Sequence, residues 1–384
     1  MLRIGILLPR STIYPSIGLD MLHGVKTYLK THQLIDQVQL FTDNIGFGID
    51  EADIYTKAEK MLLQEDAQIV IVCADERIQE LLKPIFTATN KILIMLNLGA
   101  NLPETWSTAP TCITHSLNFC FHAWLTGKEA ANAASKEAVN IISYYDGGYR
   151  VCYSLLNSHQ QNGGVPAYNY VTKLKLAEFD LQPIDAFLTE NKEVKTALCL
   201  FSGEQAVQFY QDIKPIQQKH SLTLYGSAMM QAPTLKKELP ADFSFVDMLA
   251  FVPWYSELPN AANQIFKEKI AAGGHQPANY FSLLGWETGI LIAQMLPLFE
   301  SGMAAVEMVQ QLMAASFETP RGRVSIDAHT HYSYGNAWLV KTNEQFSATV
   351  VKELTDAEAS WTAFTSEPGL KGEISSWRNT YLCI

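Results

Sequence analysis

Residues 68–73 read Gln-Ile-Val-Ile-Val-Cys, a run that is apolar at every position after the first. Such a run is typical of a β-strand that is covered on both faces. The segments on either side, Glu51–Glu65 and Arg77–Thr87, carry apolar residues at helical spacing. Together the three segments predict a strand of a parallel sheet that lies between two helices.

The alternation of strands and helices continues in both directions. Around this core we expect strands at Arg3–Leu8, Val38–Thr42 and Ile92–Leu96 and a helix at Gly18–Lys30. The pattern then restarts, with strands at Val139–Tyr144, Thr196–Phe201, Leu222–Tyr225 and Met248–Val252 and a helix at Tyr149–Gln161. Two late segments, Arg323–Ile326 and Ala337–Val340, are predicted to be extended and to add to one lobe. The fold class is therefore α/β, with two lobes that are each a parallel sheet flanked by helices and a cleft between them.

Composition excludes several classes of protein. The 384 residues are 48% hydrophobic, which is enough apolar material for sizeable cores and argues against disorder. The net charge of −11 has the wrong sign for binding nucleic acid or an anionic membrane surface. The apolar stretch Phe281–Phe299 contains Glu287 and is interpreted as a buried helix and not as a membrane span.

The cysteines and the N-terminus bear on the cellular compartment. Six scattered cysteines form no CxxC pair, so zinc ribbons and thioredoxin-like motifs are not expected, and the thiols are predicted to be buried and reduced. The chain opens directly into the first strand, without the pattern of a signal peptide. The protein is cytoplasmic if Met1 is the native start, and periplasmic if a leader was removed.

One motif suggests metal chemistry. Asp327-Ala-His329-Thr-His331 follows an apolar strand and resembles the metal-binding start of amidohydrolase barrels. In those barrels later strands supply further ligands, whereas Tyr332–Ile384 contains no additional His. The alternative is a polar turn before the next strand. Phosphate-loop, dinucleotide, zinc-protease and nucleophile-elbow motifs are absent, so we expect neither an enzyme nor a cofactor.

Candidate ligand residues follow the strands, because ligands of open parallel sheets bind beyond the carboxyl ends of the strands. These positions hold Arg10, Tyr14, Asp75, Asn97 and Asn101 in the first lobe and Tyr149, Ser202 and Ala228 in the second. Each has a simpler alternative role. Asp75 and Ser202 can be helix caps. Arg10 can be a solvent-exposed charge instead of a clamp for a carboxylate, and Tyr14 and Tyr149 can be residues at the edge of a core.

Four segments resemble one known family. Arg3-Ile-Gly-Ile-Leu-Leu-Pro9 with Ile17-Gly18-Leu-Asp-Met-Leu-His-Gly24-Val25 resembles the opening of type I periplasmic solute-binding proteins of the branched-chain amino acid and amide group. Asn97-Leu-Gly-Ala-Asn101-Leu-Pro-Glu104, Asp146-Gly-Gly-Tyr149 and Pro320-Arg-Gly322-Arg-Val324 resemble later elements of the same group. The resemblance covers residues 1 to about 345, and the tail beyond it has no counterpart.

The resemblance implies a protein that closes two lobes by hinge motion on a small polar solute. By position, Asp75, Asn97 and Asn101 would face the ligand from the first lobe, and Tyr149, Phe201 or Ser202, and Ala228 from the second. Amino-acid binders of this group usually have Ser in place of Asp75 and an acid near Ala228. An amino acid in an inverted pose, with its carboxylate on Arg10 and its amine on Asp75, is one alternative; an amide, a urea-like compound or an aromatic acid is another.

These observations lead to the following prediction. Residues 1–117 with 252–320 form lobe 1, residues 118–251 with 321–355 form lobe 2, and residues 356–384 form a C-terminal extension. The protein binds a small molecule, an amino acid, an amide or a related compound, for uptake through an ABC transporter permease or for ligand sensing. The alternative is a metal-dependent hydrolase that uses Asp327, His329 and His331.

Overall fold

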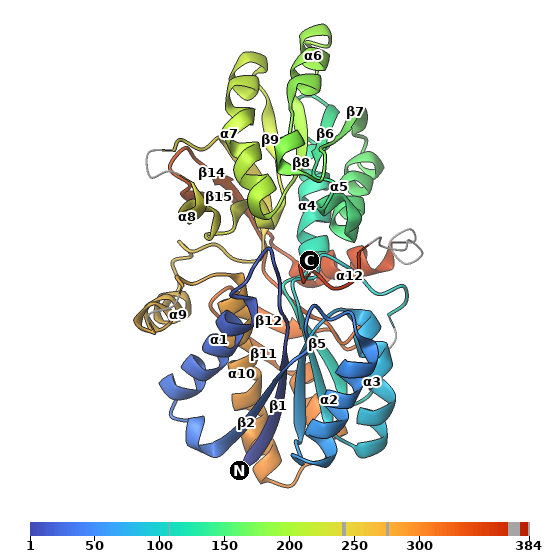
Figure 1. Ribbon diagram of the computed structural model, residues 1–384, viewed down its shortest axis with the longest axis vertical. Coiled ribbons are helices and arrows are strands. Elements are labelled where there is room, and N and C mark those ends of the chain that lie inside the picture. The colour runs from blue at the N-terminus through green and yellow to red at the C-terminus, as the bar shows by residue number, and fades with distance from the viewer. Residues whose placement is uncertain (107, 240–242, 274–275, 368–376, 383–384) are drawn as a thin grey trace. The chain divides into compact units, whose positions relative to one another are not determined.

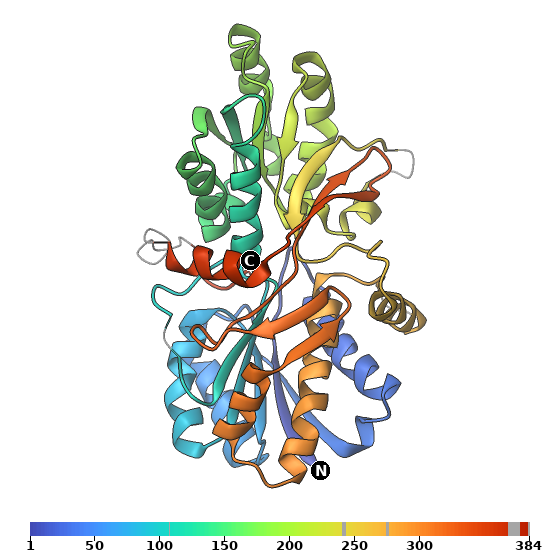
Figure 2. The ribbon, with the colours of Figure 1, turned by 180° about the vertical axis from the view of Figure 1, so that it is seen from behind.

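The computed structural model describes residues 1–106, 108–239, 243–273, 276–367 and 377–382. The chain divides into unit 1, residues 1–117, 258–335 and 378–384, and unit 2, residues 118–257 and 336–377. Figure 1 shows the ribbon, and Figure 2 shows it from behind.

Unit 1 is built on a parallel sheet with the strand order β2-β1-β3-β4-β5. Its strands are β1 (Leu2–Leu8), β2 (Val38–Asn44), β3 (Ile69–Cys73), β4 (Ile92–Asn97) and β5 (Cys112–Ser116). The helices α2 (Glu51–Leu63) and α3 (Glu76–Thr89) pack on one face of the sheet around a shared hydrophobic cluster. The buried strand and the two helices predicted around residues 68–73 are therefore confirmed.

The remaining helices of unit 1 are α1 (Ile17–Thr31), α9 (Ala261–Ala272), α10 (Tyr280–Glu300) and α11 (Ala305–Ala314). Helices α1 and α10 make the most extensive helix contact in the unit. Gly24 and Gly285 allow this approach, because a Cβ atom on Gly24 would lie 2.3 Å from the Ser282 carbonyl oxygen and one on Gly285 would lie 2.0 Å from that of Met21. Helix α10 is long and apolar enough to cross a membrane by length and composition alone, but most of it is buried, as in a core helix of a soluble protein.

A small antiparallel sheet completes unit 1, as the orange strands in Figure 2 show. It consists of β11 (Ser316–Thr319), β12 (Gly322–Ile326) and β13 (Ser333–Gly335). The sequence pattern predicts residues 321–335 in lobe 2, but the structure places them in unit 1. The reason is that β12 pairs with β11 on one side and with β13 on the other, and Tyr332 forms a bridge with Thr114 of β5.

Unit 2 contains a seven-stranded sheet with the order β15-β14-β10-β9-β8-β6-β7. Its strands are β6 (Glu137–Ile142), β7 (Val165–Val171), β8 (Thr196–Leu200), β9 (Thr223–Tyr225), β10 (Met248–Val252), β14 (Trp338–Thr342) and β15 (Ala348–Glu353). The pairs between β6, β7, β8, β9 and β10 are parallel, whereas β14 and β15 join at one edge as antiparallel strands.

The helices of unit 2 are α4 (Phe119–Ala130), α5 (Arg150–Gln161), α6 (Gln182–Glu190), α7 (Gly203–His220), α8 (Leu235–Glu238) and α12 (Ala357–Ser366). Helix α12 packs on α4 within unit 2, and residues 378–384 belong to unit 1. The predicted extension 356–384 is thus divided between the two units. Residues 252–257, which the sequence pattern predicts in lobe 1, lie in unit 2; Val252 is the last residue of β10 and the others follow it directly.

Three buried side chains form an ionic cluster in unit 1. Glu287 of α10 accepts hydrogen bonds from Nε of Arg321 at 3.0 Å, and its Oε2 lies 3.0 Å from Nε2 of His115 in β5. Burial alone would raise the pKa of Glu287, but the Arg321 guanidinium and the contact with His115 outweigh burial and lower that pKa to about 2. The acid that the sequence places inside an apolar helix is therefore a paired core group.

Removing Arg321 is expected to destabilise unit 1 strongly. The variant Arg321→Met would leave the Glu287 carboxylate buried without its cation, which costs about 3–5 kcal/mol of unfolding free energy. Urea unfolding at neutral pH checks this value. Arg323→Met is the matched control, because Arg323 lies only two residues further along the chain, in β12, and is exposed. Equal unfolding midpoints for the two variants would contradict the role of the cluster.

The cluster also predicts a pH dependence of stability. The Glu287 pKa rises from about 2 in the folded chain to its ordinary value of 4.5 on unfolding, so the stabilisation is present above pH 4.5 and is lost as the pH falls toward 2. We expect Glu287→Gln to show a shallower loss of unfolding free energy across this window, by about 3 kcal/mol in total. Glu318→Gln, the same change at an exposed position of β11, should retain the wild-type slope.

Candidate functional site

The predicted ligand residues of unit 1 lie in the loops that follow its parallel strands. Arg10 follows β1, Asp75 follows β3, and Asn97 ends β4 and begins the loop that holds Asn101. The side chains of Asp75, Asn97 and Asn101 are buried polar groups, with 3–6% of their surface exposed. The structure therefore brings three hydrogen-bonding side chains to one edge of the sheet.

Asp75 is the central polar group of this edge. It is the residue before the first turn of α3, but its side chain makes no capping hydrogen bond. Its Oδ2 accepts from Nδ2 of Asn101 at 3.1 Å, and both carboxylate oxygens accept from Oγ1 of Thr380 at 2.8 Å. Burial raises the pKa of Asp75 to about 6, although the hydrogen bonds from Thr380 and Asn101 act in the opposite direction. Asp75 is therefore not merely a helix cap, because its side chain bonds to Asn101 and Thr380 and not to the backbone of α3.

Asn97 carries an acceptor that the rest of the chain does not use. Its Nδ2 donates a long hydrogen bond of 3.5 Å to the carbonyl oxygen of Ala74. Its buried Oδ1 has no hydrogen-bond partner among the residues that the structure describes. A buried amide oxygen left without a donor is costly, and binding sites commonly provide the missing partner.

Arg10 and Tyr14 differ in exposure. The Arg10 side chain is exposed, whereas its backbone N–H donates to the carbonyl oxygen of Gly46. The Tyr14 ring is buried, 5.2 Å from the ring centroid of Phe281 and 6.1 Å from that of Tyr381. Arg10 thus keeps its charge in solvent, and Tyr14 forms an aromatic wall that is already covered.

In unit 2 a buried carboxylate organises the loops after β6 and β8. Asp146 is fully buried and accepts from Oγ of Ser143 at 2.6 Å and from Oγ of Ser202 at 3.0 Å. Ser202 precedes α7 but makes no capping hydrogen bond with it, which contradicts the alternative of a simple cap. The hydrogen bond to Asp146 instead joins the ends of two neighbouring strands.

Aromatic side chains gather on the turn that follows β6. The hydroxyl groups of Tyr145 and Tyr149 lie 2.9 Å apart, and their rings meet edge to face. The indole of Trp377 stacks on Tyr145 with ring centroids 6.5 Å apart, and its Nε1 donates to the Tyr145 carbonyl oxygen at 2.6 Å. Tyr149 therefore belongs to a ring cluster and not to an isolated core edge.

The other two predicted residues of unit 2 are apolar and buried. Phe201 is fully buried and stacks on Phe209 at 4.5 Å within the hydrophobic core, so the candidate site retains Ser202 and not Phe201. Ala228 is 3% exposed and begins a short helical turn. The buried Oγ of Ser227, beside it, has no hydrogen-bond partner among the described residues.

The Asp327-His329-His331 motif forms a turn. The carboxylate of Asp327 accepts from the backbone N–H groups of His329 and Thr330 and from the Thr330 hydroxyl. His331 is buried, and its Nδ1 lies 2.9 Å from the carbonyl oxygen of Cys112. Across the described part of the chain, no three His, Cys, Asp or Glu side chains group as metal ligands. The motif is therefore a polar turn between two strands, as the alternative in the sequence analysis predicted.

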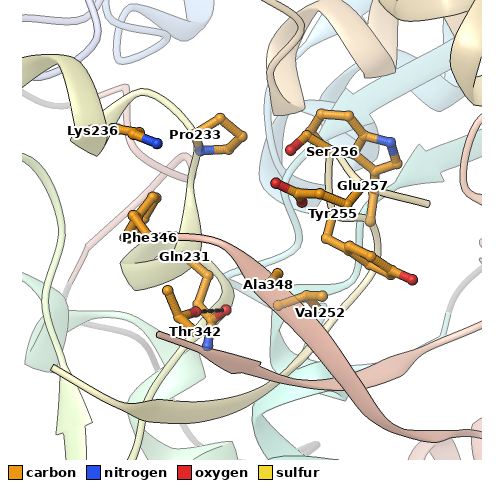
Figure 3. A pocket seen from close by; sticks show the side chains of 11 residues that line it. Gln231, Pro233, Lys236, Val252, Tyr255, Ser256, Glu257, Thr342, Phe346 and Ala348 are labelled. Atoms are coloured by element: carbon orange, nitrogen blue, oxygen red, sulfur yellow. Dashed lines mark hydrogen bonds between the residues drawn. The ribbon is translucent and has the colours of Figure 1, made fainter. Parts of the chain in front are cut away.

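A cavity of about 180 Å³ lies elsewhere in unit 2 and is shown in Figure 3. Residues from the β10 end and the β14–β15 hairpin line it, including Trp254, Tyr255 and Thr342. The Thr342 hydroxyl donates to Gln231 inside it. None of the predicted ligand residues lines this cavity, so it is separate from the candidate site.

The sequence analysis did not identify several groups of the candidate site. Tyr145 was not among the residues chosen from strand ends, and the tail residues Trp377 and Thr380 had no counterpart in the family resemblance. Tyr145 directly follows the predicted strand Val139–Tyr144, so a wider window at the end of that strand would have included it. No sequence signal places the tail beside Asp75.

Solved structures share this fold. A solute-binding protein of an ABC transporter from R. palustris, in complex with benzoate, is 20% identical, with a TM-score of 0.72 over 92% of this chain and 96% of that one. An ABC transporter substrate-binding protein from Sphaerobacter thermophilus is 16% identical, with a TM-score of 0.76 over 93% and 98%. A branched-chain amino acid ABC transporter periplasmic ligand-binding protein from Burkholderia xenovorans is 11% identical, with a TM-score of 0.75 over 94% and 97%.

The family comparison covers most of the chain. No curated protein matches the sequence. Residues 1–347 match the family of periplasmic binding proteins, which are substrate-binding proteins and not enzymes. The predicted resemblance and fold class are confirmed, and nothing in these comparisons supports the hydrolase alternative. The chain therefore belongs to the periplasmic binding protein family.

Proposed function

We propose that this chain binds one small solute without changing it chemically and presents it to an ABC transporter. Family membership and the fold support the binding of a small molecule. The observation that carries the proposal for this chain is the buried carboxylate of Asp75, at the carboxyl end of β3, where ligands of open parallel sheets bind. Ligand sensing would use the same site with a different partner.

The charge of unit 1 selects the chemistry of the solute. The Asp75 carboxylate and the unpartnered Oδ1 of Asn97 are both acceptors, so they favour a ligand group that donates hydrogen bonds. An ammonium, an amide N–H or a hydroxyl group meets this requirement, and a carboxylate at the same place would be repelled. The exposed guanidinium of Arg10 offers a separate partner for a carboxylate of the solute.

Unit 2 contributes flat and hydroxyl-bearing surfaces. Tyr145 and Tyr149 provide rings on which a planar group can pack. Ser227 provides a hydroxyl group that has no hydrogen-bond partner among the described residues. We infer that the solute is an amino acid, an amide or a hydroxylated aromatic acid that combines a donor with a planar or apolar part. Titration calorimetry with one member of each class, together with urea, tests the proposal.

The variant Asp75→Asn is expected to weaken binding of the solute about 10- to 100-fold, because a hydrogen bond to a charged group becomes one to a neutral group. Asp36→Asn is the matched control. Asp36 is exposed and precedes β2, at the opposite edge of the same sheet, and this variant should bind like the wild type. The absence of saturable binding in the wild type and in the tail variants described below would overturn the proposed function.

A further inference from the structure

The last described residues of the chain, Trp377–Leu382, form the tail segment. Here Asn379, Thr380, Tyr381 and Leu382 are all buried, with 5% or less of their surface exposed. The contacts that bury them involve the loops at the carboxyl ends of the strands, where the candidate ligand residues lie.

In unit 1 the tail segment uses the polar groups of the candidate site. The Thr380 hydroxyl donates to both oxygens of Asp75 at 2.8 Å, and the backbone N–H of Asp75 donates to Oδ1 of Asn379 at 3.1 Å. The amide of Asn379 also donates to the carbonyl oxygen of Gly48 in the loop after β2. Both the side chain and the backbone of Asp75 are therefore engaged by the tail segment.

Tyr381 holds the loop after β1 in a similar way. Its carbonyl oxygen accepts a hydrogen bond from Oγ of Ser11 at 2.9 Å. Its ring meets the Tyr14 ring edge to face, with centroids 6.1 Å apart. The aromatic wall that Tyr14 would offer to a ligand is covered by a residue of the same chain.

In unit 2 the tail segment occupies the aromatic turn. Trp377 stacks on Tyr145, and its backbone N–H donates to the carbonyl oxygen of Gly148 at 3.1 Å. A Cβ atom added to Gly148 would lie 1.6 Å from the indole Nε1. The turn thus accepts the indole closely because residue 148 has no side chain.

We propose that the tail segment is a built-in surrogate ligand, so that a solute binds by displacing it. This inference rests on the proposed function, since it assigns the tail segment to the ligand positions of the same site. The groups that it presents, a hydroxyl donor to Asp75 and a flat ring to Tyr145, match those inferred for the solute. A tethered group at an effective concentration of about 1 mM competes strongly with a dilute solute.

The test uses full-length protein and a fluorescein-labelled peptide with the sequence of residues 377–382, Trp-Arg-Asn-Thr-Tyr-Leu. In the variant Asn379→Ala/Thr380→Ala, the chain's own tail loses its hydrogen bonds to Asp75 and Gly48, so the site becomes open to the peptide. Fluorescence anisotropy should show that the peptide binds this variant at least 10-fold more tightly than the wild type. Arg378→Ala is the control, because Arg378 is exposed in the same segment, and it should exclude the peptide like the wild type.

A second measurement perturbs the docking surface without changing the tail segment. Gly148→Ala forces the indole away, whereas a Cβ atom on Gly147 would meet its nearest neighbour at an ordinary 3.4 Å. Hydrogen exchange of the amides of residues 377–382 should be faster in Gly148→Ala than in Gly147→Ala. Equal exchange in these two variants, or equal peptide binding by the wild type and the double variant, would overturn the proposal.

The two proposals fail separately. A solute that binds the wild type and Asn379→Ala/Thr380→Ala with the same affinity supports the proposed function and overturns displacement of the tail segment. Capture of the peptide by the double variant, with no solute bound by any variant, supports docking of the tail segment and overturns the solute-binding function.

Discussion

A carboxylate removed from water needs hydrogen-bond donors or a cation from the protein itself. Among the described residues four carboxylates are buried, and three of them, Glu287, Asp146 and Asp75, satisfy this constraint in different ways. Glu287 is paired with Arg321 and His115 in the core of unit 1, and Asp146 is held by serine hydroxyls in unit 2. Asp75 receives its donors from Asn101 and from Thr380 near the C-terminus. The first two join elements of the fold, whereas the third lies where a ligand would bind.

The difference between these carboxylates separates structural from functional roles. The Glu287 cluster draws on α10, β5 and the residues before β12, so breaking it would affect the whole of unit 1. Asp75 draws on a loop and on the tail segment, and in the proposed displacement the tail segment leaves while the sheet stays folded. A solute that carries the same donors would take the place of the tail segment at Asp75 in this proposal.

The periplasmic binding protein fold explains why the candidate ligand residues of unit 1 lie at one edge of its parallel sheet. Parallel strands place all their carboxyl ends on the same side of the sheet, so loops that are distant in sequence become neighbours. The residues after β1, β3 and β4 of unit 1 illustrate this effect, and the tail segment contacts the loops after β1, β2 and β3. A single terminal segment can therefore cover several ligand positions in unit 1.

Local pattern in the sequence was sufficient for the strands of both sheets that are uniformly apolar, such as Ile69–Cys73 and Met248–Val252. The choice of Asp75 and Asn97 as ligand residues stays a prediction. The local pattern did not reveal β5, because polar residues such as His115 interrupt its apolar character. His115 can be buried there because it contacts Glu287. The local pattern also assigned residues 321–335 to the wrong unit and left the tail without a role. Apolar periodicity is a local property of the chain and is visible in the sequence. The pairing of buried charges and the docking of the tail segment depend on residues up to 370 positions apart, so only the tertiary structure decides them.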